Sequence, residues 1–195
     1  GFYDRILARH EKRKGFISTG KEMRDMKTLV RAFNAAYTTE ALLDIYIGRK
    51  NGEVDYETLF RSMEIRDNVH IHYPQGLLPY ELALEVNRAA CVVVCCMETK
   101  YTVGLTTVVE AMALGLPVIC SRNPQMPVNL EAEGCGISVA YGDEEGWRKA
   151  ITYIQEHPEE VRKMGQRGRT LAEREFNDER CADEVAALLK EVIAR

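Results

Sequence analysis

The chain has 195 residues, 46% of them hydrophobic, which is enough to bury a sizeable core in one domain or two small ones. Its net charge of −4, with Lys and Arg mixed among Asp and Glu, gives no sign of a nucleic-acid-binding surface. No apolar run reaches about 18 residues, so we expect no transmembrane segment, and residues 1–14 do not resemble a signal peptide. The six cysteines form no C-x-x-C pair, which favours a reduced cytosolic protein over a disulfide framework or a zinc site.

The stretch GFISTGKE, residues 15–22, nearly matches the phosphate-binding P-loop pattern G-x-x-x-x-G-K-[ST]. Gly15, Gly20 and Lys21 fit the pattern. Glu22, however, stands where a Ser or Thr would hold magnesium, and its carboxylate would repel phosphate. The apolar residues between the two glycines predict a short strand and not a loop. A P-loop is therefore disfavoured, although a cation between a strand and the next helix is well placed to meet phosphate.

From Gly15 onward, apolar segments of strand length alternate with segments whose apolar residues have helical spacing. The predicted strands are residues 15–19, 41–48, 68–73, 91–96, 116–121 and 136–141, and the predicted helices are residues 26–37, 55–64, 79–89, 106–115, 143–157, 158–176 and 177–195. This alternation predicts an α/β fold with one doubly wound, Rossmann-like parallel sheet of about six strands. Thr106 is the expected cap of its helix, and Trp147 is expected in the core.

Ligands of such sheets bind outside the carboxyl ends of the strands. The dinucleotide fingerprint G-x-G-x-x-G follows none of the predicted strands, which disfavours a conventional NAD domain. Lys21 and Arg24 lie in the first strand-to-helix turn, where cations and backbone N–H groups can meet a diphosphate together. A solvated turn in which Arg24 pairs with Glu22 or Asp25 fits the sequence about equally well.

A second candidate segment is YTVGLTTVVEAMALGLPVICS, residues 101–121. Gly104 allows close approach of the backbone, and Glu110 lies in the first turns of an otherwise apolar helix. The helix dipole alone could explain a carboxylate there. The alternative is a carboxylate that accepts hydrogen bonds from two vicinal hydroxyls, as on a ribose.

Other residues are weaker candidates. Arg49 and Tyr73 end strands at the edge of the sheet where a ligand is expected, and Tyr73 could stack on a base or only pack. His70 and His72 alternate along one strand and could bind a metal on one face, but isolated histidines are more often edge or core residues.

The strings EAMALGLPVI and EGCGISVAYGDEEGWRKAI resemble the C-terminal half of retaining GT-B glycosyltransferases of group 1, glycosyltransferase family 4. The opening TGKEMRDMKTLVRAF and the segment LDIYIGR are similar to further signatures of that family, and the resemblance covers residues 15 to about 190. It implies that residues 15–176 bind a nucleoside-diphosphate sugar, with UDP or GDP most expected, and need neither cofactor nor metal. It also implies that the half that binds a carbohydrate or lipid-linked acceptor is missing. Residues 1–14 would then be an interdomain linker, and helix 177–195 would pack back toward the missing domain.

The resemblance also implies roles for individual residues. Lys21 and Arg24 would neutralise the donor pyrophosphate, and Glu110 would bind the ribose as the second Glu of the family's E-x7-E motif. Thr102 stands at the first Glu of that motif, so its sugar-facing role is either vacant or filled by Glu98. The remaining donor contacts are expected from Gly20, Gly48, Arg49, Tyr73, Val103, Gly104, Leu105 and Thr106.

These observations favour the donor-binding domain of a retaining, metal-independent glycosyltransferase that is cytoplasmic or peripheral at a membrane. One alternative is a nucleotide-sugar epimerase, which would need Glu98 and His72 to move protons. The other is a catalytically silent binding domain, which is consistent with Thr102.

Overall fold

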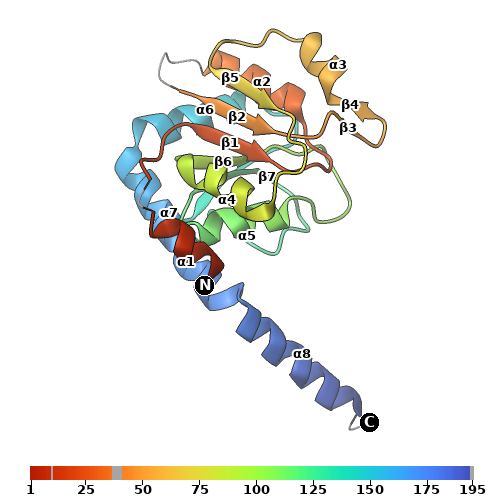
Figure 1. Ribbon diagram of the computed structural model, residues 1–195, viewed down its shortest axis with the longest axis vertical. Helices are drawn as coiled ribbons and strands as arrows, with labels where there is room; N and C mark the ends of the chain where they lie inside the picture. The colour runs from red at the N-terminus through yellow and green to blue at the C-terminus, as the bar shows by residue number, and fades with distance from the viewer. Residues whose placement is uncertain (10, 37–40, 194–195) are drawn as a thin grey trace.

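The computed structural model describes residues 1–9, 11–36 and 41–193 (Figure 1). Six strands form one sheet in the order β5-β2-β1-β6-β7-β8, and every neighbouring pair is parallel. These strands are β1 (Phe16–Thr19), β2 (Leu43–Tyr46), β5 (Val69–His72), β6 (Cys91–Val94), β7 (Val118–Ser121) and β8 (Gly136–Val139). Each lies inside a predicted strand, so the predicted doubly wound, Rossmann-like sheet is confirmed. The strand Phe16–Thr19 also occupies the positions where a P-loop would need its loop.

Helices cover both faces of the sheet (Figure 1). One apolar core joins the sheet to α2 (Met26–Ala35), α3 (Tyr56–Arg61) and α6 (Glu144–Glu156), and it includes the fully buried Trp147, as predicted. The second core joins the other face to α1 (Phe2–Leu7), α4 (Pro79–Arg88), α5 (Leu105–Ala113) and α7 (Pro158–Glu175). The central strand β6 reads Cys-Val-Val-Val and is buried at every position, because both of its faces are covered.

The structure differs from the sequence prediction in several local features, among them the residues before α3 and the start of α5. A short antiparallel hairpin, β3 (Lys50–Asn51) and β4 (Val54–Asp55), occupies a predicted connection and the first residue of the predicted helix 55–64. Its turn contains Asn-Gly, a sequence typical of tight hairpins, and Gly52 has a φ of 57°. The predicted cap Thr106 is wrong. The helix begins at Leu105, because Gly104 adopts a left-handed φ of 85° and is the N-cap.

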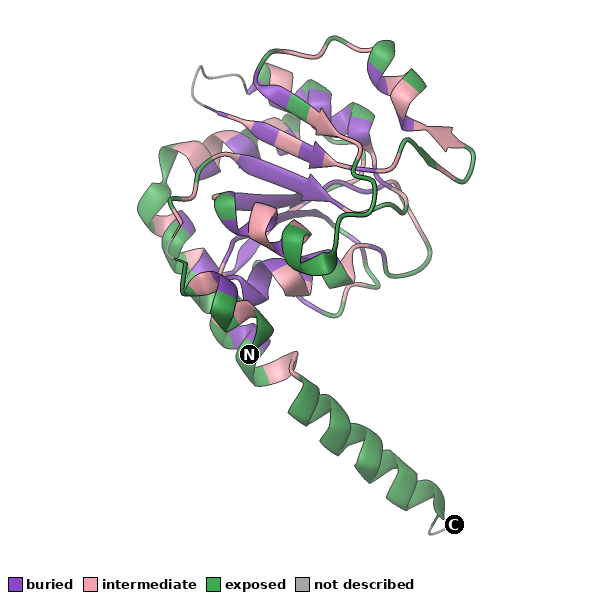
Figure 2. Ribbon diagram, in the orientation of Figure 1, coloured by how far each residue is buried: buried purple, intermediate pink, exposed green. Residues whose placement is uncertain are grey.

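The N-terminal and C-terminal segments differ in how they pack against the domain. The N-terminal segment packs on the domain, and Ile6 of α1 is fully buried. Helix α8 (Asp178–Ile193) projects away from the sheet and contains no buried residue (Figure 2).

Arg13 fastens the N-terminal segment to the domain. Its guanidinium donates hydrogen bonds to the carbonyl oxygens of Leu114, Gly115 and Asn87, at 2.6, 3.1 and 3.2 Å, and to the side-chain oxygen of Asn87 at 2.7 Å. Burial lowers the pKa of Arg13. The carbonyls of Leu114 and Gly115 follow the last turn of α5, where the helix itself leaves carbonyl groups without partners.

We expect Arg13→Ala to lower the free energy of unfolding by about 1–3 kcal/mol, because carbonyls near the end of α5 lose their donors. Arg9→Ala is the matched control in the same segment, since Arg9 is exposed and the interaction of its side chain with the described residues is a 3.7 Å ion pair with Glu11. It should change stability by no more than about 0.5 kcal/mol. Urea unfolding curves measure both values. Equal effects of the two variants would show that the hydrogen bonds of Arg13 do not stabilise the fold.

Candidate functional site

Arg24 lies at the carboxyl end of the sheet, and its side chain is buried, with 3% of the residue exposed. Its guanidinium donates to the carbonyl oxygens of Thr19 and Glu22, at 3.1 and 3.0 Å, and to Cys96 Sγ and Thr107 Oγ1, both at 3.3 Å. These contacts join the end of β1, the end of β6 and the first turn of α5. A guanidinium has five N–H donors, so one N–H of Nη2 remains unused by them.

All four acceptors of Arg24 are neutral. Two are carbonyl groups and one is a hydroxyl, and burial raises the pKa of the Cys96 thiol above its ordinary value of 9.0, although Arg24 opposes this shift. Within the described residues, no carboxylate lies within ion-pair distance of the guanidinium. Glu22 contributes its backbone carbonyl, and the Asp25 carboxylate caps α2 by accepting from Thr28 N at 3.0 Å. The alternative in which Arg24 pairs with either carboxylate is therefore wrong.

Two glycines enclose the Arg24 guanidinium. Gly20 has a φ of 107°, and a Cβ at this position would collide with Arg24 Nη2. Gly104 has a φ of 85°, and a Cβ there would lie 2.6 Å from Val94 Cγ1 and 3.7 Å from Arg24 Nη1. The guanidinium therefore lies against the N-terminus of α5, where the first backbone N–H groups have no partner within the helix.

Lys21 lies beside Arg24 in the chain but is exposed. Its backbone oxygen accepts a hydrogen bond from Asn51 Nδ2 in the β3–β4 hairpin. The Glu22 carboxylate is turned away from the guanidinium and accepts from Tyr101 Oη at 3.0 Å, which links this turn to the loop before α5. The sequence analysis missed Tyr101, Thr107 and Cys96 as partners of this turn, because contacts between distant segments leave no local signal.

Glu110 lies on α5 and is half-buried. It accepts a hydrogen bond from Tyr3 Oη of α1 at 3.5 Å. Burial raises the pKa of Glu110, and the Tyr3 hydrogen bond opposes this. Burial and the nearby Glu110 raise the pKa of Tyr3 to about 12, so the phenol keeps its proton at neutral pH. Helix α5 thus carries an acceptor, the Glu110 carboxylate, and also donors, the backbone N–H groups at its N-terminus that have no partner within the helix.

The other candidate residues of the β6–α5 loop and the start of α5 differ in their exposure to solvent. Val103 is buried, Leu105 is half-buried, and Glu98 and Thr106 are exposed. The Thr102 hydroxyl donates to the carbonyl oxygen of Gln125 at 2.8 Å, which holds the loop against the segment after β7.

Arg49 and Tyr73 meet at the ends of β2 and β5. The Arg49 guanidinium lies over the Tyr73 ring, 4.5 Å from its centroid, and also pairs with Glu57 at 2.6 Å. One face of the Tyr73 ring is therefore covered by Arg49. Gly48, which precedes Arg49, is half-buried.

A cavity of about 1090 Å³ lies at the opposite end of the strands, lined among others by Gly15, Ala90 and Pro117, which precede or flank the starts of β1, β6 and β7. It contains none of the residues predicted to bind the donor. Because ligands of parallel α/β sheets bind at the carboxyl ends, the site is assigned to the Arg24 end and not to this cavity.

We expect Gly20→Ala to cost more stability than Gly52→Ala. Both residues have positive φ, which costs other residues about 1–2 kcal/mol, but a Cβ at Gly52 would meet nothing within 4 Å. The excess cost at Gly20 therefore combines the displacement of Arg24 with the larger backbone strain at a φ of 107°, compared with 57° at Gly52. Denaturant unfolding of both variants gives the comparison, and equal losses would mean that the guanidinium does not depend on this close approach.

We expect Glu110→Gln to raise the melting temperature at about pH 7.5 and to leave it unchanged near pH 3.5. The raised pKa means that the native state keeps a proton which the unfolded chain releases above the ordinary pKa of 4.5. Ionisation of Glu110 therefore costs stability as the pH rises, and Gln removes that cost. Thermal unfolding at the two pH values tests this against the exposed Glu191→Gln. A lower melting temperature for Glu110→Gln at pH 7.5 would contradict it.

Comparisons with known proteins identify the family and the fold of the chain. The sequence model of the family described as Glycosyl transferases group 1 matches residues 5–171. MMP alpha-(1->4)-mannosyltransferase of Mycolicibacterium hassiacum is 30% identical over 140 residues, which are 71% of this chain and 33% of that protein. The chain thus spans about one third of the length of this curated relative.

Two solved structures are similar in fold. HepE of Anabaena in complex with UDP matches with a TM-score of 0.77 and 12% identity, covering 97% of this chain and 52% of that one. The C-terminal domain of a group 1 glycosyl transferase family protein (LpcC) from Francisella tularensis matches with a TM-score of 0.70 and 13% identity, covering 91% and 94% of the two chains. These likenesses confirm the fold as the Rossmann-like, C-terminal half of a GT-B architecture. Since the family model also matches most of its length, the chain belongs to the group 1 glycosyl transferase family.

Proposed function

We propose that this chain is the donor-binding domain of a glycosyltransferase that moves a sugar from a nucleoside-diphosphate sugar to an acceptor. The observation that carries the proposal is the buried guanidinium of Arg24, whose acceptors among the described residues are all neutral and which lies against the N-terminus of α5. Burying a charge without a counter-charge is costly, so this position favours an anion. A diphosphate would gain from both the guanidinium and the helix N-terminus.

In this proposal the donor extends along the carboxyl ends of the strands. Its diphosphate lies by Gly20, Arg24 and the backbone of residues 103–106, and exposed Lys21 supplies the second cation. As the bond to the sugar breaks, these groups stabilise the negative charge that develops on the leaving diphosphate. Because two cations and a helix N-terminus provide this stabilisation, the proposed transfer needs no metal, and we assign it retention of configuration.

The other donor contacts follow from the positions of the remaining residues. Glu110 accepts hydrogen bonds from the ribose hydroxyls. These bonds would either replace the hydrogen bond from Tyr3 to the Glu110 carboxylate or form beside it. Gly48, Arg49 and Tyr73 adjoin the base, and the open face of Tyr73 is available for stacking. Glu98 is the exposed carboxylate available to the donor sugar. UDP- and GDP-sugars are the favoured donors, and the UDP complex of HepE, along with a second complex of that protein with UDP-glucose, supports a uridine nucleotide.

The acceptor, a carbohydrate or a lipid-linked one, would bind to a domain outside this chain. Helix α8 offers a surface for that domain, since its exposed apolar side chains recur at helical spacing: Val185, Leu188, Leu189, Val192 and Ile193. Among the described helices, none combines the length and the apolar character needed to cross a bilayer. The proposed location is the cytoplasm, with peripheral attachment to a membrane as the way to reach a lipid-linked acceptor.

The epimerase alternative finds less support. His72 Nε2 lies 2.8 Å from Asp44 Oδ1 on the face of the sheet, and the His72 ring stacks on Tyr46. Glu98 follows β6, which is the third strand from β5 in the sheet. The silent-domain alternative is favoured by one observation, the engagement of the Thr102 hydroxyl with a backbone carbonyl where the family motif has a Glu. Binding of the donor without turnover in the full-length protein would identify a silent domain.

The function is tested by comparing UDP, GDP and inorganic pyrophosphate in calorimetric titrations of this chain. Lys21→Ala should weaken both the preferred nucleotide and pyrophosphate by about 1.5–3 kcal/mol, because a charge-assisted contact to phosphate is lost. Glu110→Gln should weaken the nucleotide by about tenfold and pyrophosphate little, because it loses half of its acceptor capacity toward the ribose.

Lys149→Ala, which removes an exposed lysine of α6, is the matched control for charge and should bind like the parent. Unchanged nucleotide affinity in both Lys21→Ala and Glu110→Gln, with the fold intact, would place the nucleotide elsewhere and reject the proposed site. Equal weakening of pyrophosphate and nucleotide by Glu110→Gln would reject the ribose assignment.

A further inference from the structure

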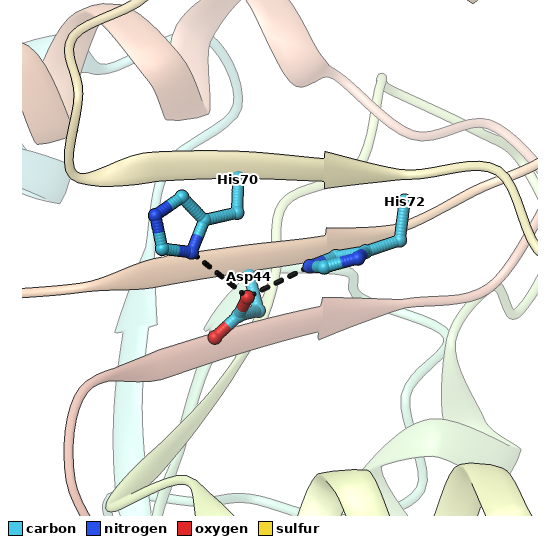
Figure 3. Close-up of side chains that lie close together, drawn as sticks. All are labelled: Asp44, His70 and His72. Atoms are coloured by element: carbon cyan, nitrogen blue, oxygen red, sulfur yellow. Dashed lines mark hydrogen bonds and ion pairs between the residues drawn. The ribbon is translucent and has the colours of Figure 1, made fainter.

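Asp44 of β2 and His70 and His72 of β5 form a cluster at the edge of the sheet (Figure 3). Parallel pairing places Asp44 directly beside His70, and the two-residue period of a strand puts His72 on the same face. The exposed fractions of the Asp44, His70 and His72 side chains are 35%, 46% and 38%. The cluster is thus reachable from solvent, and it lies on two paired strands of the sheet.

The geometry of the three side chains is close to that of a metal site. Asp44 Oδ1 lies 3.3 Å from His70 Nδ1 and 2.8 Å from His72 Nε2, and the three ligand atoms are all within 4.8 Å of one another. The two imidazole rings are nearly perpendicular, at 88°, so their nitrogens approach the carboxylate from different directions (Figure 3). Ligands of tetrahedral zinc, bound at about 2.0–2.2 Å, are separated by about 3.3 Å, so only small side-chain rotations are needed.

Neighbouring residues hold one ligand in place. The Tyr46 ring stacks on His72 with centroids 4.4 Å apart and an angle of 15°, and Tyr46 Oη donates to Glu85 at 3.4 Å. Two imidazoles with one carboxylate suit zinc and similar transition metals, whereas magnesium and calcium prefer oxygen ligands. The partial exposure of all three side chains leaves room for water as the fourth ligand.

We propose that Asp44, His70 and His72 bind one Zn²⁺ ion, which ties β2 to the edge strand β5. The site is separate from the donor diphosphate site, and the proposal does not depend on the glycosyltransferase function. It goes beyond the sequence analysis, which expected no metal site and weighed only the two histidines, because strand register and not sequence proximity brings Asp44 to them.

The test is calorimetric titration of the metal-free chain with Zn²⁺, together with its melting temperature with and without the metal. A Cys181→Ser background removes the one exposed thiol among the described residues. We expect one equivalent to bind and to raise the melting temperature. His70→Gln, His72→Gln and Asp44→Asn should each weaken binding by at least about tenfold, the loss that even outer-shell changes can produce.

His157→Gln is the matched control, because it removes an exposed imidazole that contacts only Tyr153 of its own helical segment in the described structure. It should leave zinc affinity unchanged. We expect the variants to fold, because Asp44→Asn keeps the size of the side chain and His70 is exposed. Their melting temperatures without metal check this. Absence of saturable Zn²⁺ binding by the parent, or equal affinity in the three cluster variants and in His157→Gln, would overturn the proposal.

Discussion

The proposed donor site depends on one constraint, the placement of a buried cation among neutral groups. The Arg24 guanidinium is held by carbonyl groups, a hydroxyl and a thiol from three different segments, and no carboxylate among the described residues compensates its charge. Such a cation is stabilised by an incoming anion. The same contacts fix the β1–α2 turn against the start of α5. One arrangement therefore supplies both the positive charge and the backbone N–H donors that an anion would meet.

The rest of the domain keeps this arrangement rigid. Two apolar cores sandwich the sheet, and the central strands are buried on both faces, so the carboxyl ends of β1 and β6 have little freedom to move. Gly20 and Gly104 let the backbone come close to the guanidinium, where a Cβ would collide with it or with Val94. The N-terminal segment contacts Glu110 through Tyr3, and the hydrogen bonds of Arg13 to the end of α5 hold this segment in place. The proposed site is thus built from the ends of β1 and β6, the start of α5 and the loop that joins β6 to α5.

The sequence predicted the six strands and most helices because apolar periodicity is a local property. It also singled out the turn of Lys21 and Arg24 and the helix of Glu110. It could not predict that Arg24 is buried while Lys21 is exposed, since that depends on Cys96 and Thr107, more than 70 residues away in the chain. The Asp44–His70 contact was missed for the same reason, because strand register is a tertiary property. The start of α5 was misplaced because the left-handed Gly104, and not a Thr side chain, caps it.

The most direct test of the central claim is a crystal structure of this chain with bound UDP, or with GDP if titration shows that GDP is preferred. The account predicts that the diphosphate lies at the N-terminus of α5, with its oxygens accepting from the backbone of residues 104–106 and with Arg24 behind them. Glu110 should then face the ribose hydroxyls. A diphosphate bound in the cavity at the amino ends of the strands, or one without contact to α5, would contradict the account.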